Sequence, residues 1–256
     1  MGRLRVNAII LIVFATFFFL LAAVQKTSEL NVNQIVEQID ELYRSESSYS
    51  ELEMEIVTPH WERTLKMKAW SKGMDKTFIR ILAPAKEKGV ATLRIGNEMW
   101  NYLPKTNKVI KVPPSMMMSS WMGSDFTNDD LVREFTWRED YNFKLIEPED
   151  AQEDLLYIQL IPKPDLPIVW GKVVLAARRE DYIPVWEKCY DEKGKLMRVM
   201  NFKDIKTFDG KEIPAVMELI PQDEEGNKTV IRYNDIDFNV NLSEDIFSLR
   251  NLRSRR

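Results

Sequence analysis

The chain has 256 residues, of which 45% are hydrophobic, 11% are aromatic and 30% are charged. This hydrophobic content allows a sizeable core and excludes an intrinsically disordered chain. The formal net charge of -4 excludes a broad basic surface of the kind that binds nucleic acid. A chain of this length forms one large domain or two small ones, and an all-β fold of this size is often a single domain.

The N-terminus has the pattern of an export signal. Arg3 and Arg5 precede the almost wholly apolar run Ala8–Ala23, as in the basic and apolar regions of a secretory signal. The run is slightly shorter than the about 20 residues that span a bilayer, which favours a signal peptide over residues 1–24. An uncleaved anchor in the inner membrane is the alternative. Both interpretations place the rest of the chain in the periplasm.

One amphipathic helix is predicted after this segment, over Asn31–Arg44. Its apolar side chains recur at helical spacing, and Asn31 is a plausible N-cap. A helix with a single apolar stripe must cover another surface. The stripe consists of Val32, Ile35, Val36, Ile39, Leu42 and Tyr43.

Most of the remaining chain alternates between apolar and polar residues, which is typical of an antiparallel sheet with one polar face. Asp209-Gly210, between two extended runs, favours a tight hairpin. We therefore predict about ten strands in one meander without βαβ units. The alternating runs are Leu52–Ile56, Leu65–Ala69, Phe78–Leu82, Ala91–Ile95, Met99–Leu103, Leu155–Leu160, Lys172–Ala176, Leu196–Met200, Ala215–Leu219 and Thr229–Tyr233.

A methionine-rich segment from Pro113 to about Phe135 interrupts this pattern. Its composition suits neither a strand nor a long helix, and methionine side chains adapt to irregular apolar surfaces. Thr127 begins a predicted short helix that extends to Phe135, with Asp130 as its capping-box partner. We predict that this segment forms a lid over an apolar ligand.

The predicted fold is mainly β (α+β), with a single strongly curved antiparallel sheet that forms an unclosed half β-barrel. A sheet this wide curls, and its hollow is filled by side chains, helices or a ligand. The N-terminal helix and the methionine-rich segment would cover the hollow of one domain over residues 30–250. A last helical turn is expected after Ser243. The basic tail, residues 251–256, is either a solvated end or a contact for anionic lipid or an acidic partner.

The sequence lacks the patterns of a catalytic or metal centre. His60 is the only histidine and Cys189 the only cysteine, which weakens nucleophilic triads and zinc sites and excludes an internal disulfide. We expect His60 at an exposed hairpin tip and Cys189 packed inside. Asp129 and Asp130 suit the first turn of a helix better than a cation site. No enzymatic activity, metal or cofactor is predicted.

Several segments resemble those of the outer membrane lipoprotein-sorting protein family, relatives of the LolA and LppX type of periplasmic lipid carrier. The resemblance covers roughly residues 30–250 and is carried by Arg63–Gly73, Pro84–Gly89, Leu93–Pro104 and the methionine-rich segment through Asp130. It implies an unclosed β-barrel that is lidded by helices and binds acyl chains. It also implies transport between membranes, beside transporters of the RND type or the ABC type.

The candidate site residues come from the early strands and the methionine-rich segment. Arg63, Arg80 and Arg94 are candidates to gate the lid or to bind a headgroup. For Arg80 and Arg94 the alternative is an outward side chain whose stem packs on the sheet. The apolar candidates for the cavity and lid are Met67, Ile81, Leu93, Ile95, Trp100, Tyr102, Met116, Met117, Met118, Trp121, Met122 and Phe126.

The predicted function is that of a periplasmic carrier that binds the acyl chains of a lipid or lipoprotein and moves it between the inner and outer membranes. It would contact membranes transiently and bind no nucleic acid. The alternative is a membrane-tethered accessory module that docks on an RND-type or ABC-type exporter without its own cargo. The seven tryptophans could also form sugar-binding platforms, although among so many Met, Leu and Ile residues they suit an apolar interior or a membrane-facing rim better.

Overall fold

The computed structural model describes residues 31–132, 136–166 and 168–254. The chain divides into an N-terminal segment, Met1–Asn31, and one compact unit, Val32–Arg256. The compact unit contains every element described below.

Three of the sequence predictions fall wholly or partly outside the described residues. They are the signal peptide or anchor over residues 1–24, the end of the short helix at Phe135, and the last two residues of the basic tail, Arg255 and Arg256.

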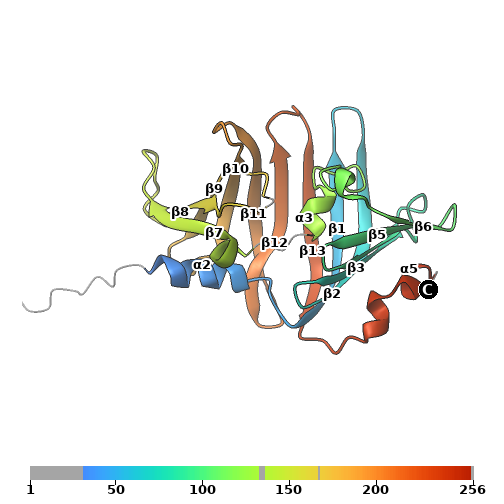
Figure 1. Ribbon diagram of the computed structural model, residues 1–256. Helices are drawn as coiled ribbons and strands as arrows, with labels where there is room; N and C mark the ends of the chain where they lie inside the picture. Colours follow the sequence, from blue (N-terminus) through green and yellow to red (C-terminus); the bar gives the residue numbers. More distant parts are fainter. Residues whose placement is uncertain (1–30, 133–135, 167, 255–256) are drawn as a thin grey trace, which may run out of the picture. The chain divides into compact units, whose positions relative to one another are not determined.

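Among the described residues, thirteen strands form one antiparallel sheet (Figure 1). They are β1 (Ser47–Val57), β2 (Glu62–Lys72), β3 (Lys76–Ala83), β4 (Ala91–Ile95), β5 (Glu98–Leu103), β6 (Lys108–Lys111), β7 (Tyr141–Ile146), β8 (Leu155–Pro162), β9 (Lys172–Arg178), β10 (Pro184–Tyr190), β11 (Leu196–Phe208), β12 (Lys211–Pro221) and β13 (Lys228–Phe238).

The sheet has two arms that meet where β1 pairs with β13. Its order is β6-β5-β4-β3-β2-β1-β13-β12-β11-β10-β9-β8-β7, so β6 and β7 are its edges and it does not close. The predicted unclosed antiparallel sheet is therefore confirmed. The predicted strand number was too low, because the ten runs do not include β6, β7 and β10. β6 has only four residues, and β7 follows a helix without an intervening turn signal.

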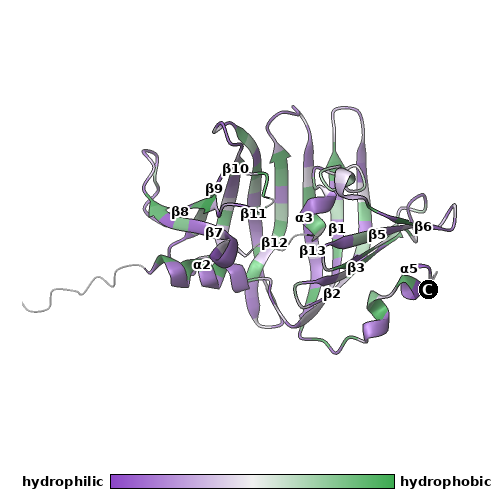
Figure 2. Cartoon of the chain, in the orientation of Figure 1, coloured by the Kyte–Doolittle hydropathy of each residue, from purple (hydrophilic) through white to green (hydrophobic). Residues whose placement is uncertain are grey.

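Period-two alternation separates the two faces of the central strands, as predicted. On β1, Leu52, Met54 and Ile56 are buried in the core, whereas the glutamates between them lie on the polar face. Glu53 there pairs with Lys66 of β2 at 2.8 Å. Figure 2 shows the same alternation of apolar and polar residues along many of the strands.

The predicted N-terminal helix is α2 (Val32–Glu41). Its stripe packs in one cluster with buried side chains of β7, β8 and β9. The short helix α4 (Trp137–Asp140) is joined to it, because Asp40 accepts hydrogen bonds from the backbone N–H groups of Trp137 at 3.2 Å and Arg138 at 3.1 Å. No helix within the described part of the chain is long and apolar enough to cross a membrane.

Residues 113–132, which we call the lid, form the 3-10 turn η1 (Pro114–Met116), a loop and the helix α3 (Asn128–Val132). The predicted capping box is present. The Thr127 N–H donates to Asp130 Oδ2 at 2.8 Å, and the Asp130 N–H donates to Thr127 Oγ1 at 3.1 Å. The buried Trp121 and Phe126 pack the lid onto the core of β1, β2 and β3.

The C-terminal segment covers the opposite face of the same arm. It forms the 3-10 helix η2 (Glu244–Phe247) and the helix α5 (Leu249–Leu252), which is the helical turn predicted after Ser243. Phe247 and Leu252 pack with buried side chains of β3, β4 and β5. Both faces of β3 are therefore covered.

The predicted tight hairpin at Asp209-Gly210 joins β11 to β12. Phe208 pairs with Lys211, which leaves a two-residue loop. Asp209 and Gly210 have φ values of 49° and 82°, and such a turn needs left-handed backbone at both positions. This local signal was sufficient to place the turn.

Replacing Leu252 by Ala should lower the free energy of unfolding by about 2–5 kcal/mol, because truncation of a buried leucine leaves a cavity. Leu252 is 0% exposed, whereas Leu249 in the same helix is 43% exposed. Leu249→Ala should change stability by less than about 0.5 kcal/mol. Urea denaturation measures both values, and equal losses would contradict the packing of α5 on the sheet.

Candidate functional site

A cavity of about 1540 Å³ lies between α2 and the lid, over strands β9 to β12. Figure 1 shows α2, α3 and α4 on the same side of the sheet. The helix α2 and the lid cover different arms of the sheet, because α2 packs on β7 to β9 and the lid packs on β1 to β3. The cavity exceeds the about 300–1,000 Å³ of a typical small-molecule pocket, so it has room for a long ligand.

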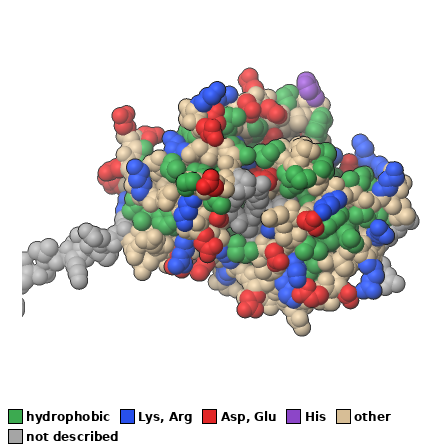
Figure 3. All heavy atoms as spheres, in the orientation of Figure 1, with side chains coloured by type: hydrophobic (Ala, Val, Ile, Leu, Met, Phe, Trp, Pro, Cys, Tyr) green, Lys and Arg blue, Asp and Glu red, His purple; other side chains and the backbone are tan. Residues whose placement is uncertain are grey.

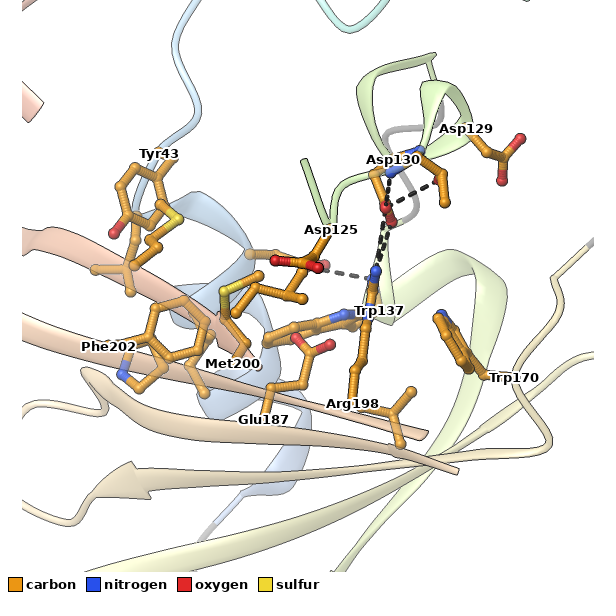
Figure 4. Close-up of a pocket in the computed structure, with 18 of the residues that line it drawn as sticks. Tyr43, Asp125, Asp129, Asp130, Trp137, Trp170, Glu187, Arg198, Met200 and Phe202 are labelled. Atoms are coloured by element: carbon orange, nitrogen blue, oxygen red, sulfur yellow. Dashed lines mark hydrogen bonds and ion pairs between the residues drawn. The ribbon is translucent and has the colours of Figure 1, made fainter. Parts of the chain in front are cut away.

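The wall of the cavity is largely apolar over its central strands. On β11, the side chains of Arg198, Met200 and Phe202 share one face because they are two residues apart. Trp137 and Trp170 line another part of the wall (Figure 4). The apolar residues of the lining are Ile39, Leu42, Tyr43, Met74, Met118, Trp137, Tyr141, Ile168, Val169, Trp170, Val173, Met197, Met200, Phe202, Met217 and Leu219, together with Pro184 and Pro221.

Arg198 connects the sheet to the lid across this wall (Figure 4). Its Nη1 donates to both carboxylate oxygens of Asp130, at 3.0 and 3.1 Å. Its guanidinium also lies over the Trp170 ring, 4.6 Å from the centroid. The Arg198 side chain is only 15% exposed, so this is a largely buried ion pair.

The charges around Arg198 keep its guanidinium protonated. Burial alone would lower the pKa of Arg198, but the nearby carboxylates of Asp130 and Glu187 outweigh burial and raise it. Asp130 therefore has two functions, since it caps α3 and also neutralises Arg198. Both contacts hold the lid in its present position.

Sequence reasoning missed Arg198, although the signal that marked Arg80 and Arg94 was present. Arg198 is a single arginine in the apolar run Leu196–Met200. Its partner Asp130 is 68 residues away along the chain, and only the folded sheet brings the two together.

A second polar contact anchors the lid to β13. The Thr229 hydroxyl donates to Asp125 Oδ2 at 2.6 Å, and the Asp125 N–H donates to Thr229 Oγ1 at 2.9 Å. Burial raises the pKa of the Asp125 carboxyl, although the hydrogen bond from Thr229 opposes this shift. The Trp121 indole N–H adds a contact to β4, because it donates to Thr92 Oγ1 at 3.1 Å.

The three predicted arginines have different partners. Arg63 donates to the Met122 carbonyl oxygen in the lid and to Glu87 at 3.3 Å. Arg80 donates to the Asn251 carbonyl oxygen at 2.9 Å and to that of Ser254, so it contacts the C-terminal segment.

Arg94 donates through Nε to the Gly96 carbonyl oxygen at 3.1 Å. Arg80 and Arg94 are both buried. Arg80 packs over the Phe78 ring, 5.0 Å from its centroid, on the face under the C-terminal segment and away from the lid. Of the three arginines, Arg63 is the one that touches the lid, and its gating function stays a prediction.

The predicted apolar residues occupy two faces of the sheet. Six lie in or against the core under the lid: Met67, Ile81, Met117, Trp121, Met122 and Phe126. Four lie in or against the cluster under the C-terminal segment: Leu93, Ile95, Trp100 and Tyr102. Met116 and Met118 are each 51% exposed.

The expectation that Leu93, Ile95, Trp100 and Tyr102 face the lid is corrected by the strand register. Leu93 pairs with Phe78 and with Trp100, and directly paired residues lie on the same face of a sheet. Of all twelve predicted apolar residues, Met118 lines the large cavity. Their parts in binding lipid stay predictions.

The single cysteine and the single histidine lie where they were predicted. Cys189 is buried as predicted, and burial raises the pKa of its thiol. His60 is exposed. The described residues contain no group of three or more His, Cys, Asp or Glu side chains that could hold a metal ion.

A family model described as an uncharacterized protein matches residues 73–254. The chain belongs to this family. No curated protein matches the chain.

Three solved structures share the fold over most of their own length. A DUF1329 family protein from Desulfovibrio piger is 25% identical, with a TM-score of 0.77 over 86% of this chain and 97% of that one. An outer membrane lipoprotein-sorting protein domain from Vibrio parahaemolyticus is 23% identical, with a TM-score of 0.74 over 87% and 98%. A LolA superfamily protein from Nitrosomonas europaea is 22% identical, with a TM-score of 0.71 over 87% and 99%. The predicted resemblance to the lipoprotein-sorting fold is therefore confirmed.

Replacing Asp130 by Asn should speed hydrogen–deuterium exchange in the lid. The change removes the counter-ion of a buried arginine, and breaking such a pair costs about 3–5 kcal/mol. Mass spectrometry of peptides from residues 113–132 measures the effect. Asp204→Asn is the control, because it breaks an exposed pair with Lys206 and should leave the lid unchanged. Equal exchange in both variants would refute the anchoring function of Asp130.

Acidic pH should strengthen the anchoring of the lid by Asp125. A raised pKa means that the folded protein holds this proton more tightly than the unfolded chain. Protonated Asp125 contributes its full stabilisation of the folded state when the pH is below 3.8, the ordinary pKa of an aspartate. This contribution declines as the pH rises through the higher pKa that Asp125 has in the folded protein.

Asp125→Asn keeps an acceptor for Thr229 without the charge, so it should remove this part of the pH dependence and protect the lid better at neutral pH. Hydrogen exchange of the lid, corrected for the intrinsic effect of pH, measures both proteins. Identical pH profiles would show that Asp125 does not contribute.

Proposed function

We propose that the protein is a periplasmic carrier that holds the acyl chains of a lipid or lipoprotein in the cavity between α2 and the lid. The observation that carries this proposal is the size of that cavity together with the largely apolar wall over its central strands. The relatives described as lipoprotein-sorting and LolA superfamily proteins support it by their shared fold. The apolar run Ala8–Ala23 behind two arginines supports export.

Binding would be driven by the removal of acyl chain from water. At about 0.8 kcal/mol for each buried CH₂ group, a long chain contributes roughly 10 kcal/mol before ordering costs. Met200, Met217 and Phe202 provide adaptable and aromatic contacts on the sheet side of the cavity. No chemical step on the cargo is needed for this function.

Release would require the lid to move, because the lid forms one wall of the cavity. Asp130, Asp125, Trp121 and the Met122 carbonyl oxygen join the lid to the sheet by polar contacts. Opening therefore requires new hydrogen-bond partners for these groups, because a buried polar group left unpaired is costly. We propose that a membrane protein of the RND type or the ABC type loads or unloads the carrier between the inner and outer membranes.

Replacing Met200 by Asp should weaken binding of a fluorescent long-chain fatty acid by about 100-fold or more. The new carboxylate loses its hydration when the chain enters, and this costs several kcal/mol, where about 1.4 kcal/mol is tenfold in affinity. Fluorescence titration of the delipidated protein measures the dissociation constant.

Ile205→Asp is the matched control. Ile205 lies on the same strand, is 37% exposed and does not line the cavity. Its replacement should change the affinity less than threefold, roughly the effect of an ordinary surface substitution. Equal affinities for Met200→Asp and the parent protein would refute the cavity as the acyl-chain site.

A further inference from the structure

A second pocket of about 410 Å³ lies apart from the large cavity and shares no lining residue with it. It forms where the loop Pro84–Val90, between β3 and β4, meets the turn between β5 and β6. Arg80, Lys86, Lys88 and Lys105 contribute the charges of its lining.

The charge of this pocket is uncompensated. It has four basic lining residues and no acidic one, on a chain whose net charge is -4. Lys86, Lys88 and Lys105 are exposed, and among the described residues no carboxylate lies within ion-pair distance of them. The hydrogen bonds that Arg80 donates go to neutral carbonyl oxygens.

The one carboxylate of the loop turns away from this surface. Glu87 is buried and pairs with Arg63 at 3.3 Å, so it does not neutralise the lysines on either side of it. The C-terminal segment that Arg80 binds adds another exposed cation, Arg253. In Figure 3, Lys and Arg side chains lie along the edge of the molecule where Figure 1 draws β6 and its neighbouring turn.

Exposed apolar side chains accompany these cations. Leu82 is 37% exposed and lines the pocket, and Leu103 is 36% exposed next to Pro104 of the lining. Lysines around exposed leucines suit the interface of a bilayer, where the cations meet anionic headgroups and the apolar side chains enter the headgroup boundary.

We propose that the surface formed by the exposed Lys86, Lys88 and Lys105, beside the buried Arg80, docks the protein on membranes that contain anionic phospholipid. The cations pair with lipid phosphate groups, and Leu82 and Leu103 contact the boundary between headgroups and acyl chains. This inference adds a membrane contact to the proposed carrier function and uses none of the residues that line the large cavity.

The docking surface is connected to the lid through the partly buried Arg63. The loop that presents Lys86 and Lys88 to the membrane also holds Glu87, which binds Arg63. Arg63 in turn donates to the Met122 carbonyl oxygen in the lid. A membrane contact that shifts the loop therefore acts on a residue that holds the lid.

The test is co-sedimentation of the full protein with vesicles of phosphatidylcholine alone and with vesicles that also contain phosphatidylglycerol. The protein should bind the second kind and not the first, and added salt should weaken binding. The triple variant Lys86→Gln, Lys88→Gln, Lys105→Gln should bind about 100-fold more weakly, since each lysine contributes roughly fivefold near an anionic surface.

The control carries Lys144→Gln, Lys193→Gln and Lys195→Gln, which remove the same charge from exposed lysines outside both pockets. It should bind anionic vesicles within about threefold of the parent protein. Equal losses in the two triple variants, or no loss in either, would overturn the proposal. Both variants should keep the parent affinity for the fluorescent fatty acid, so a failure of docking is distinguishable from a failure of acyl-chain binding.

Discussion

The inner face of a thirteen-stranded sheet is wider than any one helix can cover, and this constraint organises the molecule. The helix α2 packs on the arm of β7 to β9, and the lid packs on the arm of β1 to β3. The central strands between them stay uncovered, and the cavity lies over these strands. A hollow whose wall over the central strands is largely apolar therefore follows from the way the sheet is covered, and the proposed carrier function uses that hollow.

The two covers are held in different ways. The stripe of α2 is buried, with Ile35, Val36 and Ile39 almost inaccessible, so displacement of this helix would expose a large apolar surface. The lid packs on its core through Trp121 and Phe126, with Met117, Met122 and Leu131 beside them, and it also has polar contacts to three strands of the sheet. Polar groups can exchange these partners for water or for a partner protein, so of the two covers we expect the lid to be the one that moves when cargo enters or leaves.

Local signals in the sequence predicted the elements, whereas the site depends on contacts that no local signal contains. The stripe of α2, the Thr127–Asp130 capping box and the turn at Asp209-Gly210 each lie within a short segment, so their residues specify the structure directly. The alternation in Ala91–Ile95 separates Leu93 from Thr92 and Arg94. It could not show which of the two faces lies under the lid, because both faces of β4 are buried. The pair of Arg198 with Asp130 could not be predicted either, since it depends on the register of β11 against a distant lid.

The most direct measurement of the central claim is native mass spectrometry of the protein isolated without detergent from cells that express and export it, followed by lipid analysis of the denatured sample. The account predicts a stoichiometric adduct that contains acyl chains and is lost from the Met200→Asp variant. A mass equal to that of the polypeptide alone, unchanged after incubation with membranes, would contradict the account.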